Sequence, residues 1–169
     1  VLMMAATRQS GVSTIELRTA DLVGPLADVD FEAAEPDRVI AKGASALELV
    51  DQLAARLRVL YASRLLGVCH AIVDRSVAYA KERFQFDRPI GTFQGLQHIL
   101  ADMAASLHGA RNVCYMAQAA LDADHSEAET WTLVAKAYLA RTALQIAESA
   151  LQAHGGIGYT SEIDLHHLY

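Results

Sequence analysis

The sequence predicts a mainly α-helical fold: an antiparallel bundle of long helices, preceded by a few β-strands. Three long segments repeat apolar residues at helical spacing, and only short polar or glycine- and proline-containing stretches separate them. Because short connections between long amphipathic helices require antiparallel neighbours, these helices should run up, down and up. The composition agrees, since 53% of the 169 residues are hydrophobic, only 7% are aromatic, and alanine is abundant enough for close helix packing.

Residues 1–43 predict strands and turns and form the first expected domain. An apolar run covers residues 1–7, and polar and apolar residues alternate over residues 12–18 and 27–31. Three short strands leave a face and two edges of a sheet uncovered. We therefore expect this segment either to pair with something absent from the chain or to be unstable.

The second expected domain, residues 44–169, begins with a helix over about residues 46–83. Such a helix is about 55 Å long, at about 1.5 Å per residue. It contains one glycine, Gly67, which we expect close contact with another helix to explain. Leucines spaced four, four and three residues apart define one of its faces: Leu49, Leu53, Leu57 and Leu60.

Two further helices are predicted. The second runs from Phe93 to about Ala123, with Thr92 as its expected N-cap. A polar turn over residues 122–127 leads to the third, which ends at Gly155, where glycine permits a left-handed C-cap. Residues 159–169 begin another short element, so the bundle lacks most of a fourth helix. The third helix carries the most regular heptad of the chain: Leu133, Ala137, Ala140, Leu144, Ala147 and Leu151.

Charge and hydropathy exclude some classes of function. The formal net charge is −6, without a basic stripe that could displace counterions from nucleic-acid phosphates. An anionic ligand must therefore be held by a few placed arginines. No apolar run reaches about 18 residues, so no membrane span is expected. Cys69 and Cys114 should be buried thiols. Together with the excess of arginine over lysine, these features favour a bacterial cytoplasmic protein.

Generic catalytic and metal-binding motifs do not occur in the sequence. It contains no Glu-x-x-His pair, no His-Glu-x-x-His, no paired Cys-x-x-Cys and no phosphate-binding Walker loop. The Gly-Gly-Ile-Gly run at residues 155–158 lacks the dinucleotide-fold spacing and follows no predicted strand. The histidines are expected to be solvated or ordinary helix positions. We therefore predict no metal site.

Two long sequence blocks resemble the signature of acyl-CoA dehydrogenases. The first is Tyr-Ala-Lys-Glu-Arg-Phe-Gln-Phe-Asp-Arg-Pro-Ile at residues 79–90, followed by Phe-Gln at 93–94 and Ala-Asp-Met at 101–103. The second is Gln-Ala-His-Gly-Gly-Ile-Gly-Tyr-Thr-Ser-Glu at residues 152–162. The resemblance covers residues 44–169 and implies the C-terminal helical domain of that family, with residues 1–43 as the end of its middle β domain.

This resemblance implies FAD as the cofactor and α,β-dehydrogenation of an acyl-CoA thioester as the reaction. Arg83 matches the family arginine that reaches the FAD phosphates of a neighbouring subunit, and a planar guanidinium suits bidentate phosphate contact. The alternative is a surface arginine that stabilises the C-terminal end of its helix. Phe86 would pack against the flavin or the adenine; the alternative is that it anchors its loop.

Further cofactor contacts are implied at two other positions in the chain. Gln94 would donate toward the adenosine part of FAD, unless it is an ordinary surface glutamine. Gln152, Gly155 and Gly156 match the segment that contacts the partner's FAD, where glycine lets the backbone approach phosphate; the alternative is a plain helix end. Because these contacts cross to another subunit, a homo- or hetero-oligomer is implied, with a dimer of dimers as the family habit. An electron-transfer acceptor would reoxidise the flavin.

The general base of the reaction is not visible in the sequence. Most family members place a glutamate shortly after the point that matches Tyr169, and a minority place one near the position of Leu57. Leucine cannot take a proton, and Glu162 matches a structural position. Arg58 would suit the phosphates of CoA or the surface. Either the base lies outside this chain, or this is the base-less subunit of a heteromer.

The end of the chain departs from the commoner family pattern. The Asp-Leu-His-His-Leu-Tyr run at residues 164–169 is more similar to divergent actinobacterial members, some of which pair as unlike subunits on steroid side chains. Asp87 replaces the usual glycine and predicts a differently shaped loop. Three functions therefore remain open: a dehydrogenase part, an FAD-supporting non-catalytic subunit, or a helical oligomerisation module without activity.

Overall fold

The structure is a computed structural model that describes residues 2–18, 26–160, 162–163 and 165. The chain divides into two compact units, Val1–Ala54 and Ala55–Tyr169. As predicted, it is mainly helical, with three long helices and a few short strands. No helix within the described ranges is long and apolar enough to cross a membrane.

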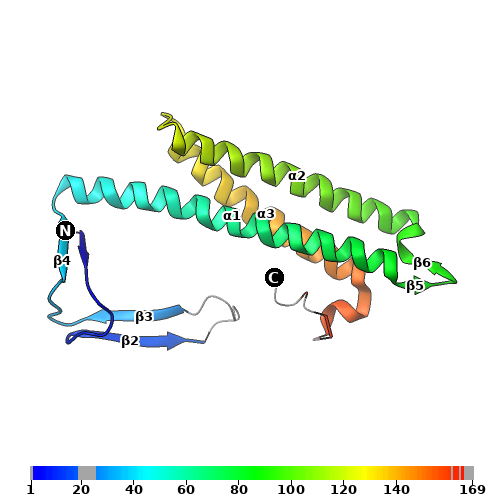
Figure 1. The fold of residues 1–169 in the computed structure, drawn as a ribbon, viewed down its shortest axis with the longest axis horizontal. Helices are drawn as coiled ribbons and strands as arrows, with labels where there is room; N and C mark the ends of the chain where they lie inside the picture. Colours follow the sequence, from blue (N-terminus) through cyan, green and yellow to red (C-terminus); the bar gives the residue numbers. More distant parts are fainter. Residues whose placement is uncertain (1, 19–25, 161, 164, 166–169) are drawn as a thin grey trace. The chain divides into compact units, whose positions relative to one another are not determined.

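The first unit contains two separate two-stranded antiparallel sheets (Figure 1). β1 (Leu2–Met4) pairs with β4 (Arg38–Ala41), and β2 (Val12–Leu17) pairs with β3 (Leu26–Phe31). The sequence predicts the first three of these strands but not β4, which is too short to show alternation. The side chains of β3 are exposed on both faces, as expected for a sheet without a covering layer.

The long helix α1 (Ala44–Glu82) begins in the first unit and continues through the second. Its bounds agree with the predicted 46–83 within two residues. The expectation for Gly67 is wrong, because a Cβ built at this residue would meet nothing within 4 Å. The glycine is exposed to solvent in this chain and mediates no close helix contact.

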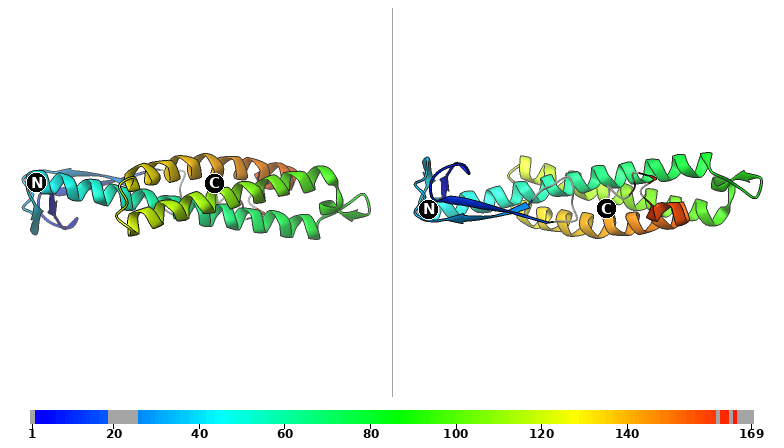
Figure 2. Two further views of the ribbon diagram at one scale, coloured as in Figure 1. Left: turned by 90° about the horizontal axis from the view of Figure 1, so that it is seen from above. Right: turned by 90° about the horizontal axis from the view of Figure 1, so that it is seen from below.

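Helices α2 (Gln94–Asp122) and α3 (Ala128–His154) complete the second unit. They lie beside the α1 segment of this unit (Figure 2). A short hairpin, β5 (Phe84–Gln85) and β6 (Arg88–Pro89), and a 3₁₀ turn, η1 (Ile90–Thr92), connect α1 to α2. The prediction that Thr92 is the N-cap of α2 is wrong. Its hydroxyl donates to the Pro89 carbonyl over 2.7 Å, and Phe93 occupies the N-cap position.

The core of the second unit consists of two clusters along the three helices. One surrounds Ile72, Met103 and Ile146, and the other surrounds Ala62, Cys114 and Leu139. Both cysteines are buried and free, as predicted. The heptad face predicted on α3 is largely outside this core, since Leu144 is 61% exposed whereas Leu139 is 0% exposed. Small side chains, not the heptad leucines, therefore make most of the α3 packing.

Candidate cofactor-binding site

Arg83 lies at the C-terminal end of α1, directly after its last helical residue. Its N–H donates to the Tyr79 carbonyl over 2.9 Å, and its own carbonyl accepts from the Ile90 N–H over 2.8 Å. The side chain is exposed, and no carboxylate of a described residue lies within 4.0 Å of the guanidinium. The backbone of Arg83 is thus fixed at both sides, while no carboxylate of the described residues pairs with its charge.

The hairpin that follows presents an aromatic side chain to solvent. Phe86 and Asp87 have φ of 54° and 60°, and the positive φ at both central residues is the requirement of a type I′ turn. Phe86 is 86% exposed, and its ring meets Phe93 edge-on with 6.0 Å between centroids. The Arg88 guanidinium lies 4.0 Å from the centroid of the Phe93 ring. The hairpin is therefore attached to the start of α2.

Gln94 is the first residue of α2 and is exposed. The start of α2, and Gln94 with it, directly follows the hairpin and η1, and Figure 1 shows this start at the β5–β6 end of the bundle. The second side-chain amide of this turn, Gln97 Nε2, donates to the Gly91 carbonyl over 2.9 Å. Gln94 makes no such local bond in the described chain and remains available to a ligand.

The end of α3 brings the glycine segment to this same end of the second unit. Gly155 is the C-cap, with φ 65° and ψ −143°, and its N–H donates to the Leu151 carbonyl. Gly156 follows in the 3₁₀ turn η2 (Gly155–Tyr159), and Gln152 is exposed on the last turn of α3. A Cβ at Gly155 or Gly156 would meet nothing within 4 Å, so the space beside this turn is open.

A stacked ring pair connects the ends of α1 and α3. The rings of Tyr79 and His154 have centroids 4.5 Å apart and planes 25° from parallel. A cavity of about 340 Å³ adjoins them and is also lined by the carboxylates Glu82 and Glu162. The sequence did not single out Tyr79 or His154, although each lies within four residues of a predicted FAD contact.

Arg58 does not belong to this end of the bundle. It is 83 − 58 = 25 residues from Arg83 on one continuous helix, or about 37 Å. Its Nη1 lies 3.9 Å from Glu129 Oε1 near the start of α3 and makes no hydrogen bond to any described group. Leu57, beside it, occupies the position at which a minority of acyl-CoA dehydrogenases are expected to carry the base.

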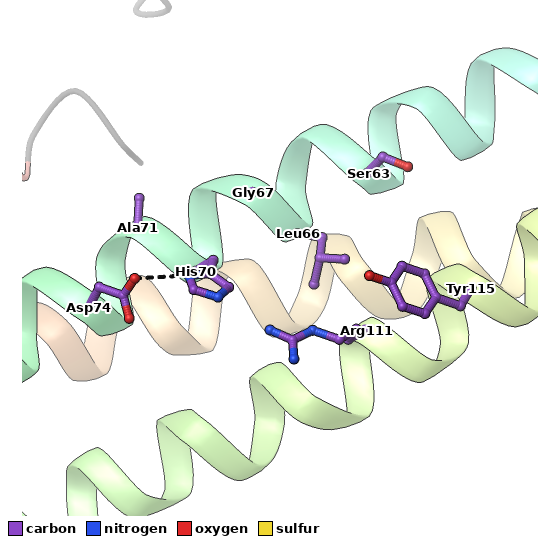
Figure 3. Close-up of a pocket in the computed structure, with 8 residues that line it drawn as sticks. All are labelled: Ser63, Leu66, Gly67, His70, Ala71, Asp74, Arg111 and Tyr115. Carbon is purple, nitrogen blue, oxygen red and sulfur yellow. Dashed lines mark hydrogen bonds and ion pairs between the residues drawn. The ribbon is translucent and has the colours of Figure 1, made fainter.

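A separate groove of about 620 Å³, lined by both polar and apolar residues, lies between α1 and α2 (Figure 3). It contains the Arg111 and Tyr115 side chains of α2, and His70 Nδ1 is 3.0 Å from Asp74 Oδ2 on α1. Gly67 is one of the residues that line this groove. None of the predicted site residues lines this groove. Within the described ranges, no group of three or more His, Cys, Asp or Glu side chains could hold a metal ion.

Comparison with known proteins identifies relatives of the chain. Residues 47–169 match the family described as "Acyl-CoA dehydrogenase, C-terminal domain". The chain is 40% identical over 112 residues to a 3-(aryl)acrylate reductase of Clostridium sporogenes, covering 66% of this chain and 29% of that protein. It is 40% identical over 106 residues to the probable acyl-CoA dehydrogenase YngJ of Bacillus subtilis, covering 62% of this chain and 27% of that protein.

The fold comparison agrees with the sequence comparison. A variant of the Tcur3481–Tcur3483 steroid ACAD superposes with a TM-score of 0.82 at 29% identity, over 97% of this chain and 43% of that chain. The chain thus spans less than a third of the length of the two curated relatives. Because the family match covers most of its residues, the chain belongs to the acyl-CoA dehydrogenase family and contains the C-terminal domain of that family.

Proposed function

We propose that the chain is part of an FAD-dependent acyl-CoA dehydrogenase that desaturates the α,β-bond of an acyl-CoA thioester. The observation that carries this proposal is the convergence of two sequence blocks at one end of the bundle. Arg83 of the first block and the Gly155 turn of the second lie at helix ends that the Tyr79–His154 stack connects. FAD, when bound, supplies the acceptor for the substrate hydride.

The residues at this end fit a flavin dinucleotide. A dianionic diphosphate needs donors, and the chain carries a net charge of −6, so its contacts must be local. Arg83 provides a cation without an intramolecular carboxylate partner among the described residues, and the Gly155–Gly156 turn leaves open space for a phosphate. The exposed Phe86 ring offers an apolar surface for the flavin or the adenine.

The remaining site residues have smaller proposed roles. Gln94 and Gln152 are both exposed and would donate to polar atoms of the dinucleotide from the first turn of α2 and the last turn of α3. Arg58 would face CoA phosphates only if its weak pairing with Glu129 opened. Because Arg83 and Gly155 would contact a partner subunit's cofactor, we propose an oligomer of at least two subunits, with a dimer of dimers as the arrangement that the family resemblance implies. The proposed setting is cytoplasmic lipid metabolism, with a separate electron-transfer protein as acceptor.

A second candidate function is a non-catalytic, FAD-supporting subunit of a heteromeric dehydrogenase. Two features support it: Leu57 lies near the position at which a minority of the family carries the base, and the similar steroid ACAD structure carries two protein names, Tcur3481 and Tcur3483. In this case the chain's residues would bind and orient the flavin, while the partner would supply the proton-abstracting group.

The test is to purify the full-length protein that contains this chain, alone and with its natural partner. The first proposal predicts a yellow flavoprotein that oxidises an acyl-CoA with an artificial electron acceptor when alone. The second predicts bound flavin but turnover only with the partner. A full-length protein without flavin in either preparation would reject both and support a helical oligomerisation module.

A further inference from the structure

A backbone contact holds the His154 ring of the Tyr79–His154 stack in place. The His154 side chain is only 7% exposed, and its Nδ1 lies 2.8 Å from the Ala150 carbonyl oxygen. Since a carbonyl only accepts, Nδ1 carries the hydrogen and donates it, which restricts rotation of the ring. The centroid distance of 4.5 Å to Tyr79 is in the range of stabilising aromatic pairs.

The main chain of each residue is also linked to a residue of the proposed phosphate site. The Tyr79 carbonyl accepts the Arg83 N–H over 2.9 Å, which sets the backbone orientation from which the guanidinium extends. His154 immediately precedes Gly155, and a Cβ added to Gly158 in η2 would lie 3.3 Å from the His154 Cβ. The stack therefore joins the two backbone segments that carry the two halves of the site.

We propose that the Tyr79–His154 stack positions Arg83 and the Gly155–Gly156 turn at the spacing that one FAD diphosphate requires. This inference rests on the proposed function. His154 is a positioning residue, because it acts through the main chain of its neighbours. α1 and α3 also pack through the cluster around Ile72 and Ile146. Within the described ranges they have no other aromatic contact, and this pair lies at the helix ends that carry the proposed site.

The experiment measures FAD dissociation from the full-length oligomer and its thermal unfolding for five variants. His154→Leu removes both the ring and the hydrogen bond and is expected to weaken FAD binding about three- to tenfold, the range of an aromatic pair. His154→Phe restores the stack and should stay within about twofold of the wild type. Leu139→Ala, in the other core cluster, is the control for general loss of stability.

The fourth variant is Arg83→Ala, and the fifth combines it with His154→Leu. If His154 positions Arg83, the double variant should lose less FAD affinity than the product of the two single effects. Strict additivity, or an equal FAD loss in Leu139→Ala at a temperature where all variants are folded, would overturn the positioning role. The outcomes distinguish the positioning role of His154 from the phosphate-binding role of Arg83. FAD loss in Arg83→Ala but not in His154→Leu rejects only the positioning role. No FAD loss in either variant rejects the proposed phosphate site.

Discussion

The Arg88 guanidinium lies over the face of Phe93, 4.0 Å from the ring centroid, and this contact attaches the β5–β6 hairpin to the start of α2. The Phe86 ring also meets the Phe93 ring, at an interplanar angle of 81°, so one aromatic residue contacts two side chains of the hairpin. A proposed flavin contact therefore depends on a residue that is not itself a proposed contact.

Phe93→Leu should loosen this hairpin without unfolding the bundle. An exposed cation–π pair contributes about 0.5–1 kcal/mol, so amide exchange in residues 84–89 should accelerate about two- to fivefold. Phe93→Tyr retains the ring and is the matched control. Hydrogen exchange followed by mass spectrometry or NMR measures the effect. Equal protection in the leucine and tyrosine variants would show that the ring does not hold the hairpin.

Two leucines on α3 should respond very differently to truncation. Leu139 is 0% exposed, and Leu139→Ala should lower the free energy of unfolding by about 2–5 kcal/mol through lost burial and a residual cavity. Leu144 is 61% exposed in this chain, and Leu144→Ala should change the free energy of unfolding by about 0.5 kcal/mol or less. Urea unfolding of the chain measures both. Similar losses for the pair would contradict the observed packing of α3.

Alanine substitutions of the two glycines at the end of α3 should differ in their cost to stability. Gly155 has φ 65° and ψ −143°, a region almost restricted to glycine, so Gly155→Ala should cost about 1–3 kcal/mol of stability. Gly156 does not have a positive φ, and Gly156→Ala should be far milder. Neither new Cβ meets a neighbour within 4 Å, so backbone strain alone is tested. A Gly155→Ala variant as stable as Gly156→Ala would refute the assigned conformation.

Alkaline pH should destabilise the chain partly through Cys69. Burial raises the pKa of its thiol from 9.0 to about 11, against a smaller opposing effect of a backbone hydrogen bond. In the unfolded chain the thiol ionises first, so stability is fully present below about pH 9 and is lost as pH rises toward 11. Unfolding measured across this window should show a shallower decline in Cys69→Ala. Parallel curves for the two proteins would exclude the contribution of this thiol.

The helices are predictable from the sequence because their signals are long and periodic. Residues 44–82 contain no proline and one glycine, and the bounds of α2 and α3 follow from the turns at Pro89, residues 123–127 and Gly155. The short strands are not predictable to the same degree. β4 has four residues, and the β5–β6 turn uses Phe86 and Asp87 at positive φ, where Asn-Gly is the usual signal.

The sequence predicts which residues belong to the candidate site better than it predicts how they are arranged. The predicted cofactor contacts come from two recognisable blocks, but the Tyr79–His154 stack joins residues 154 − 79 = 75 positions apart. Helical periodicity gives the face of each residue and not its partner on another helix. The error at Gly67 has the same origin, since a glycine in a helix indicates space without showing whether a helix or solvent fills it.

The central claim is that Arg83 binds the diphosphate of FAD, and the flavin content of the full-length oligomer after dialysis tests it most directly. Arg83→Ala should weaken FAD retention by about 1.5 kcal/mol or more, roughly tenfold in the dissociation constant, as expected for a lost charged hydrogen bond. Arg141→Ala, an exposed arginine within α3, should retain the flavin of the wild type. Unchanged flavin content in Arg83→Ala would contradict the account.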